Sequence, residues 1–201
     1  MVLRLSGGRR LLSPEGSGAR PTPSRVRLAV MNLLAAELPG CSWLDLFSGS
    51  GVMGCEALQR GAGRVVAVER DRRHLAVIRR NLEAVAGHSP EGRWPPAGTW
   101  PEPRHGEPQV WVVGADAITW LAKPGHARPF DLIYADPPYR AGLYGAMAEG
   151  IRAEGWLAPG GTLVWECASD DLPVLPEGWN CRDQRRYGSS TIQLLEVAAE
   201  A

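Results

Sequence analysis

Short apolar segments alternate with segments of helical periodicity along most of this 201-residue chain. The apolar segments are rich in β-branched residues and are bounded by glycine, aspartate or proline, which is typical of buried strands. Expected strands cover residues 42–47, 65–68, 110–113, 132–134 and 162–165, and expected helices cover 22–38, 51–60, 71–86, part of 116–122 and 140–155. This alternation predicts an α/β fold in which a mostly parallel sheet carries helices on both faces.

Two segments depart from the alternation. Residues 179–197 have the pattern of two strands joined near residues 187–190, so we expect an antiparallel hairpin at the edge of the sheet. Residues 87–109 hold six of the 17 prolines, which predicts a long surface insertion. We expect that a short linker can replace residues 88–107 without loss of the fold.

The predicted organisation is a basic N-terminal arm over residues 1–21, followed by one domain over residues 22–201. The chain has 22 basic and 22 acidic residues, but residues 1–40 contain six arginines against two glutamates. Arginine supplies 21 of the 22 cations, which fits either a GC-rich genome or phosphate recognition by planar guanidinium groups. Arginines that could hold a nucleic-acid backbone are Arg9, Arg10, Arg20, Arg25, Arg185 and Arg186.

Several classes of protein are excluded by composition and cysteine spacing. No uninterrupted apolar run approaches the ~20 residues that cross a bilayer, and the N-terminus lacks the apolar core of a secretion signal. The four cysteines form no C-x-x-C pair and have no histidine at ligand spacing, so we expect no metal site and no structural disulfide. These features favour a cytoplasmic protein without a membrane partner. Separately, we expect a monomer.

The segment from Asp45 to Gly54 follows an expected strand and begins an expected helix. Its glycines satisfy G-x-G-x-x-G, which lets a nucleotide cofactor approach the backbone, although a tight turn without a ligand has the same pattern. Glu69 ends the next strand, where a carboxylate can bind ribose hydroxyls or merely begin the following helix. NAD and S-adenosylmethionine both carry a ribose. Asp45 favours the second, because a carboxylate repels pyrophosphate and tolerates a sulfonium, unless this residue only caps the turn.

A second motif, Asp136-Pro137-Pro138-Tyr139, follows the expected strand 132–134. The prolines remove two N–H donors, so the Asp136 carboxylate and the Pro137 carbonyl remain as acceptors at one place. Such acceptors can bind the hydrogens of a nucleobase amine and free its lone pair for attack, while the Tyr139 ring can stack on the base. The alternative is a proline turn with a half-buried tyrosine. Together with the glycine motif, D-P-P-Y indicates chemistry at a nucleobase amine.

The segments DLFSGSGVMGCEAL, VVAVERD, DLIYADPPY and RRYGSSTIQLLEV, with RPTPSRVRLAVMNLL near the N-terminus, resemble the RsmD-type bacterial 16S ribosomal RNA guanine-N2-methyltransferases. The resemblance runs from about residue 3 to residue 197. It implies a Rossmann-like, seven-stranded S-adenosylmethionine methyltransferase fold. Two features depart from the family, namely the longer insertion at 87–109 and the pair Pro23-Ser24 where the family tends to be more acidic.

The resemblance also implies roles for individual residues. Cofactor-binding residues would be Asp45, Gly49 and Gly51 at the methionine part, with Phe47 in the same loop, Glu69 at the ribose, and Asp116 and Ala117 at the adenine. By spacing alone, Asp116 is equally suited to cap a helix. Asp136, Pro137 and Tyr139 would form the catalytic site for the target amine.

The expected activity is therefore methylation of the N2 amine of a guanine, with 16S ribosomal RNA or a small-subunit particle as partner. A DNA or RNA adenine-N6 methyltransferase also uses D-P-P-Y, but 201 residues leave no room for the added target-recognition domain that the DNA enzymes usually carry. An NAD-dependent oxidoreductase would leave D-P-P-Y unexplained. A ribosome-assembly factor without catalytic activity would have no need of Asp136.

Overall fold

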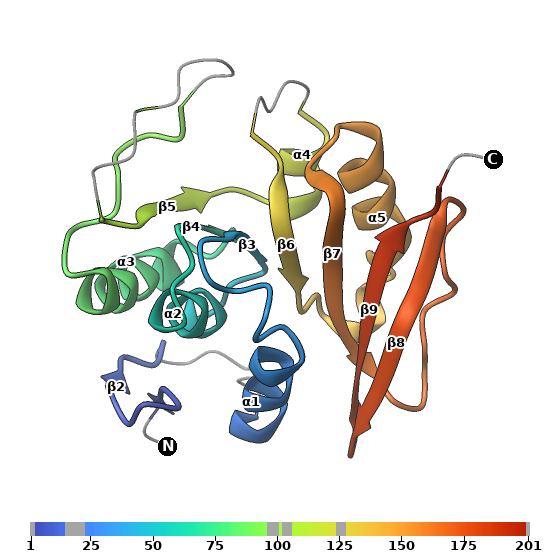
Figure 1. Cartoon of the computed structure of the whole chain (residues 1–201), viewed down its shortest axis with the longest axis horizontal. Helices are drawn as coiled ribbons and strands as arrows, with labels where there is room; N and C mark the ends of the chain where they lie inside the picture. The colour runs from blue at the N-terminus through green and yellow to red at the C-terminus, as the bar shows by residue number, and fades with distance from the viewer. Residues whose placement is uncertain (1–2, 15–22, 96–100, 102–105, 124–127, 200–201) are drawn as a thin grey trace.

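The computed structural model describes residues 3–14, 23–95, 101, 106–123 and 128–199. Its centre is a seven-stranded sheet in the order β5-β4-β3-β6-β7-β9-β8 (Figure 1). The strands are β3 (Ser42–Leu46), β4 (Arg64–Glu69), β5 (Gln109–Gly114), β6 (Phe130–Ala135), β7 (Leu157–Ala168), β8 (Trp179–Tyr187) and β9 (Ser190–Val197). Neighbours from β5 to β7 are parallel, whereas β9 pairs antiparallel with β7 and with β8. The expected mostly parallel sheet with a C-terminal antiparallel hairpin is confirmed.

Helices cover both faces of the sheet. Since successive strand residues point to opposite faces, each strand contributes side chains to two apolar layers. In β3, Trp43 belongs to an apolar layer with α1 (Ser24–Leu33), α2 (Val52–Gln59) and α3 (Arg72–Ala86). The next residue, Leu44, belongs to a second layer with α4 (Ala117–Leu121) and α5 (Tyr144–Ala153). This burial on both sides explains why the central strands are almost continuously apolar.

Two expected helices are shorter than their apolar periodicity suggested. The segment 22–38 forms α1 only to Leu33 and continues as turns. The segment 140–155 begins with a 3-10 turn, η1 (Tyr139–Ala141), and Gly142 with φ of 64° separates this turn from α5. A left-handed residue ends the helical path, and glycine adopts it without strain. In the described part of the chain no helix is long and apolar enough to cross a membrane.

Part of the expected N-terminal arm is packed onto the domain. Strands β1 (Leu3–Arg4) and β2 (Arg10–Leu11) pair antiparallel, and Leu5 and Leu11 are buried against the layer of α1 to α3. We call residues 3–11 the N-terminal hairpin. Glu56 of α2 fixes it, because its buried carboxylate accepts both the N–H and the hydroxyl of Ser6, at 2.9 and 2.6 Å, and pairs with Arg27. Residues 15–22 of the arm lie outside the described residues.

The proline-rich insertion also contacts the core. Trp94 packs edge-on against Trp111 and Trp120, with ring centroids 5.7 and 5.4 Å apart. The interpretation of all of residues 88–107 as a surface loop is therefore wrong at Trp94, and the replacement of the segment by a linker stays a prediction. Composition could not reveal this contact, because the partner rings lie on β5 and α4, outside the insertion. Residues 96–100 and 102–105 lie outside the described part of the chain.

Candidate active site

The two sequence motifs meet at the carboxyl ends of β3 and β6, which are neighbours in the sheet. The chain proceeds from β3 to β4 and β5 on one side, and then crosses to β6 on the other side of β3. Such a reversal of strand order is where open α/β sheets bind their ligands. The charge of Asp136, which follows β6, raises the pKa of Asp45 in β3, so the two carboxylates lie close enough to interact. The fold thus brings the glycine motif and D-P-P-Y together.

The loop between β3 and α2 is built from residues with positive φ. Phe47, Gly49 and Gly51 have φ of 58°, 56° and 74°. At Gly51, which caps α2, a Cβ would also lie 3.1 Å from Ile78 Cγ2, so both conformation and packing require glycine there. At Gly54 a Cβ would lie 3.0 Å from Val65 on β4, which shows that this glycine serves close packing of helix on strand. The loop therefore presents backbone rather than side chain at the beginning of α2.

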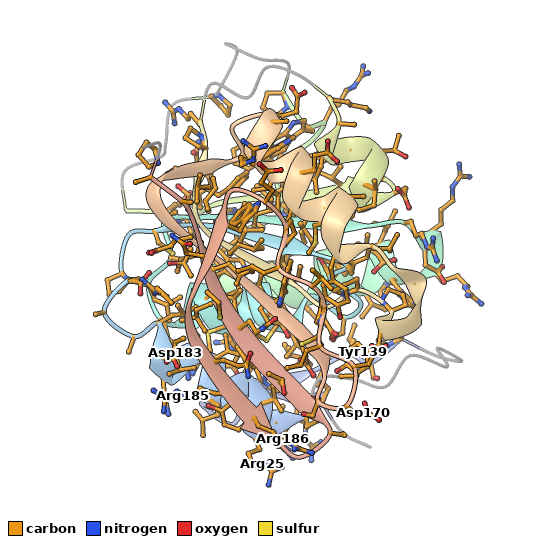
Figure 2. All side chains as sticks on the ribbon, turned by 90° about the vertical axis from the view of Figure 1, so that its right-hand side faces the viewer. Arg25, Tyr139, Asp170, Asp183, Arg185 and Arg186 are labelled. Atoms are coloured by element: carbon orange, nitrogen blue, oxygen red, sulfur yellow. The ribbon has the colours of Figure 1, made fainter. Side chains whose placement is uncertain are left out.

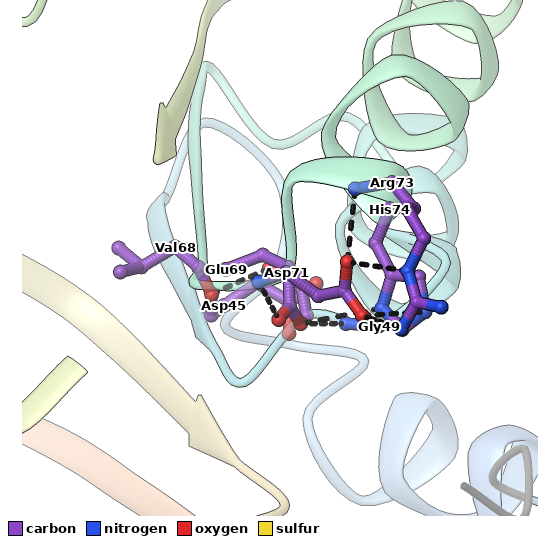
Figure 3. A network of polar contacts seen from close by, with 8 residues as sticks. Asp45, Gly49, Val68, Glu69, Asp71, Arg73 and His74 are labelled. Atoms are coloured by element: carbon purple, nitrogen blue, oxygen red, sulfur yellow. Dashed lines mark hydrogen bonds and ion pairs between the residues drawn. The ribbon is translucent and has the colours of Figure 1, made fainter. Parts of the chain in front are cut away.

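Glu69 at the end of β4 connects this loop to the next helix (Figure 3). Its Oε2 accepts the N–H of Gly49 at 2.9 Å, and its Oε1 accepts the N–H of Asp71 at 2.8 Å. The cap of α3 is Asp71, whose carboxylate accepts the N–H of Arg73 and also binds the Arg73 guanidinium, which lowers the pKa of Asp71. Glu69 is therefore not the helix-capping acid, and its carboxylate stands beside the glycine loop.

Asp45 lies beneath the same loop with 1% of its surface exposed. Its Oδ2 accepts the N–H of Gly54 at 3.2 Å, so it orders the turn into α2. Burial raises the pKa of Asp45 well above its usual range, and the nearby charges of Glu69 and Asp136 raise it further. The capping role considered for Asp45 is present, and the same position gathers three carboxylates around one end of the loop.

Asp116 follows β5 and caps α4. Its Oδ1 accepts the N–H of Thr119 at 3.0 Å and the Thr119 hydroxyl at 3.2 Å, while Arg70 lies 3.8 Å from its other oxygen. Ala117, the first residue of α4, is buried. The helix-cap alternative for Asp116 is thus observed at the position where the resemblance implies an adenine contact.

The D-P-P-Y turn is held by side chains. Pro137 is buried, Asp136 is half-buried, and Tyr139 opens η1. The Tyr139 hydroxyl donates to Glu166 Oε1 on β7 at 2.9 Å and lies 3.2 Å from the Ser190 hydroxyl on β9. Burial and the charge of Glu166 raise the pKa of Tyr139, so its hydroxyl stays protonated. These bonds fix the orientation of the ring.

Sequence reasoning missed Glu166 and Ser190. Glu166 interrupts the apolar run of β7, which the sequence shows, but its 1% exposure and its contacts are visible only in the structure. Ser190 carried no such signal, because a serine at the start of a strand is common in turns.

The arginines chosen as nucleic-acid contacts separate into two groups, of which Figure 2 shows the group of Arg25, Arg185 and Arg186. Arg25 of α1 and Arg186 of β8 meet at the β8–β9 turn, where Arg186 Nε donates to the Gly188 carbonyl at 3.2 Å and Arg25 Nη2 lies 3.3 Å from the Cβ position of Gly188. Arg185 is nearby on β8 and binds Asp183 at 3.0 Å. In the N-terminal hairpin, Arg9 donates to the Ala84 carbonyl of α3 and Arg10 is exposed. Arg20 lies outside the described residues.

Comparison with known proteins gives consistent matches over almost the whole chain. The model of a family described as "Conserved hypothetical protein 95" matches residues 5–96 and 99–196. A curated Escherichia coli (strain K12) protein, "Ribosomal RNA small subunit methyltransferase D", is 29% identical over 194 residues, which is 96% of this chain and 87% of that protein. The Haemophilus influenzae protein of the same name is 26% identical over 196 residues, covering 98% and 92%. A solved structure described as the putative methyltransferase yhhF from Escherichia coli has a TM-score of 0.77 at 28% identity and covers both chains fully.

Proposed function

Because this chain belongs to the Conserved hypothetical protein 95 family and is an RsmD-type ribosomal RNA methyltransferase, we propose that it methylates the N2 amine of a guanine in small-subunit (16S) ribosomal RNA, with S-adenosylmethionine as donor. The observation that carries the proposal is that the three carboxyl groups of Asp45, Glu69 and Asp136 lie near one another at the β3–β6 reversal. Asp45 and Glu69 surround the glycine loop, and Asp136 stands on the other side with its charge reaching Asp45. A ribosomal substrate implies that the enzyme works in the cytoplasm, and we expect a monomer.

The residues of the glycine loop fit a cationic nucleoside. Each oxygen of Glu69 accepts one backbone N–H, which leaves further acceptor capacity for a pair of ribose hydroxyls. The negative charges of Glu69 and Asp136 disfavour ionisation of the buried Asp45, so a positive sulfur among these three carboxyl groups would be stabilised. Phe47, Gly49 and Gly51 would hold the methionine part, and Asp116 and Ala117 the adenine. When bound, S-adenosylmethionine supplies an electrophilic methyl group.

The D-P-P-Y residues would prepare the nucleophile. The Asp136 carboxylate and the Pro137 carbonyl would accept the two hydrogens of the guanine amine, whose lone pair is otherwise delocalised into the ring. Tyr139, held through its hydroxyl, would stack on the base after it leaves its helix. Asp136 would also take up the proton that the methylated amine releases. Asp136, Pro137 and Tyr139 are therefore the proposed catalytic residues.

The RNA backbone would be held by arginines next to this site. Arg25, Arg185 and Arg186 gather at the β8–β9 turn, whose Ser190 contacts Tyr139. Arg10 of the N-terminal hairpin and Arg20 would extend the contact. Arg9 is the weakest candidate, because its guanidinium already binds the Ala84 carbonyl at the end of α3.

Methyl transfer to ribosomal subunits tests the proposal. Small subunits from a strain that lacks this enzyme are incubated with S-adenosylmethionine carrying a labelled methyl group, and the labelled nucleotide is identified by mass spectrometry. We expect one N2-methylguanine in 16S RNA, and no label in subunits from the strain that keeps the enzyme. A label on adenine N6, a label on DNA, or no transfer at all would overturn the proposal.

A further inference from the structure

Glu166 collects hydrogen bonds from both sides of the D-P-P-Y turn. Its Oε2 accepts the hydroxyl of Tyr134 at 3.0 Å, and its Oε1 accepts the hydroxyl of Tyr139 at 2.9 Å. Its main-chain carbonyl accepts the hydroxyl of Tyr144 at 2.8 Å. Tyr134 lies on β6 before the motif, Tyr139 ends the motif, and Tyr144 begins α5 after it. One residue of β7 therefore holds the chain before, at and after the catalytic turn.

The turn needs such support from side chains because its backbone offers little. Pro137 and Pro138 have no N–H, so two consecutive residues cannot join a hydrogen-bond ladder. Within the turn, the Ala141 N–H donates to the Pro138 carbonyl at 2.9 Å. The hydroxyl of Tyr139 makes a hydrogen bond to Glu166 on β7, and so links the turn to the sheet where the prolines cannot.

The burial of the Glu166 carboxylate is not explained by packing alone. Glu166 is 1% exposed, and burying a charged or polar group is unfavourable unless it is hydrogen-bonded. Cys167 and Trp165, its neighbours on β7, are apolar and fully buried, so this stretch of strand is otherwise core. The two tyrosine hydroxyls satisfy the carboxylate, and in return the carboxylate fixes both rings.

We propose that Glu166 is a positioning residue that acts through the Tyr139 hydroxyl and holds the Tyr139 ring in the orientation that stacks the target base. The inference rests on the proposed function, since it assumes that Tyr139 receives a nucleobase. Ser190, 3.2 Å from the same hydroxyl, completes the support from β9. Because Glu166 is 1% exposed, we expect its effect on the reaction to pass through Tyr139 rather than through a contact with the substrate.

A double-mutant cycle between Glu166→Gln and Tyr139→Phe tests this inference. Each single variant is expected to lower kcat/KM for the RNA about 10- to 100-fold, because small misplacement of a stacked base is costly. Cofactor affinity should stay near the wild-type value. The double variant should have a kcat/KM no lower than that of the less active single variant, because both substitutions remove the same interaction. Independent, additive losses, or an equal loss of cofactor affinity, would overturn the inference.

Tyr134→Phe is the matched control. It removes the same kind of bond from the other oxygen of Glu166, but on β6 rather than on the motif. It should lower the melting temperature while leaving kcat/KM for the RNA close to wild type. If Glu166→Gln does not fold, Tyr139→Phe decides alone, and a wild-type rate in that variant overturns the inference. Ratios of variant to wild type can be measured on whichever amine the wild type methylates, so an error in the guanine assignment would be visible separately.

Discussion

The proposed site has a cofactor side, formed by the glycine loop, and a target side, formed by the D-P-P-Y turn. The two sides are stabilised by different kinds of contact. On the cofactor side, the carboxylates of Asp45 and Glu69 bind backbone N–H groups at separations of 9 and 20 residues. On the target side, the Tyr139 hydroxyl binds side chains of Glu166 and Ser190, which are 27 and 51 residues away. Backbone donors are present whatever the sequence, whereas side-chain donors and acceptors can be lost by one substitution. A contact on the cofactor side can therefore be lost only at its carboxylate, whereas a contact on the target side can be lost at either of its two side chains.

Substitution of Asp136 should produce the largest difference between the effect on methyl transfer and the effect on cofactor binding. Asp136→Ala is expected to lower kcat about 10³-fold, since it deletes the acceptor for the amine hydrogens, while cofactor affinity stays within a few-fold. Single-turnover methyl transfer and calorimetry with the cofactor measure the two quantities. Asp136→Asn, which keeps one acceptor oxygen, should fall between. Loss of cofactor binding together with activity would contradict the separation.

The complementary change is Glu69→Ala on the cofactor side. Losing a charged acceptor should cost about 1.5–3 kcal/mol of cofactor binding, which is roughly a 10- to 150-fold higher KM for S-adenosylmethionine. The rate at saturating cofactor should change much less. Asp71→Ala is the control, because it keeps the backbone N–H that Glu69 accepts. An unchanged cofactor KM for Glu69→Ala would show that this carboxylate only organises the loop.

A change at the far edge of the sheet should affect neither side. Trp94→Ala removes a ring that packs on Trp111 and Trp120, and we expect a loss of about 2 kcal/mol in the free energy of unfolding. For a chain of this length this lowers Tm by ~4–8 °C. Thermal unfolding measures the loss, with Trp94→Phe as the milder variant. Lower cofactor affinity in the folded protein would mean that the insertion reaches the site.

The arginine pair at the β8–β9 turn tests whether RNA is held on the target side. Arg25→Ala with Arg186→Ala should weaken RNA binding about tenfold at moderate salt and reduce the slope of log affinity against log salt by ~1.4, since two phosphate contacts are lost. The methylated base should not change. Arg152→Ala with Arg182→Ala is the control, because these arginines lie away from the turn. An unchanged salt slope for the first pair would indicate that Arg25 and Arg186 are solvated surface charges.

The smallest expected effect is a gain in stability from Asp45→Asn. Because burial raises the pKa of Asp45, the folded protein keeps a proton that the unfolded chain loses above pH ~4. The wild type therefore loses stability as pH rises from that point towards the raised pKa, and the amide does not. We expect the cofactor-free variant to be more stable at neutral pH by on the order of 1 kcal/mol, or ~2–4 °C in Tm, with no difference near pH 4. A lower Tm at neutral pH would contradict this.

The same contrast explains what could be read from the sequence. The strands and the glycine loop between β3 and α2 were predictable, because apolar periodicity, closely spaced glycines and a carboxylate at a strand end are local signals. The roles of Asp136 and Tyr139 stay predictions from their motif. Glu166 was not predictable, since its importance depends on the pairing of β7 with β6 and β9, which places it under a turn 27 residues earlier. Trp94 was hidden in the same way by a proline-rich composition.

The N-terminal hairpin is synthesised before the residues that it contacts in the folded protein. Ser6 needs Glu56, Leu12 bonds through both its N–H and its carbonyl to the Asn81 side chain, and Arg9 binds the carbonyl of Ala84. None of these partners exists while the hairpin is being made, and at ~5–20 residues per second they follow several seconds later. The full set of these contacts can therefore form only after α3 has been synthesised. Because Asn81 also donates to the Ser50 carbonyl at 2.9 Å, Leu12, which follows the hairpin, binds the same side chain as the glycine loop.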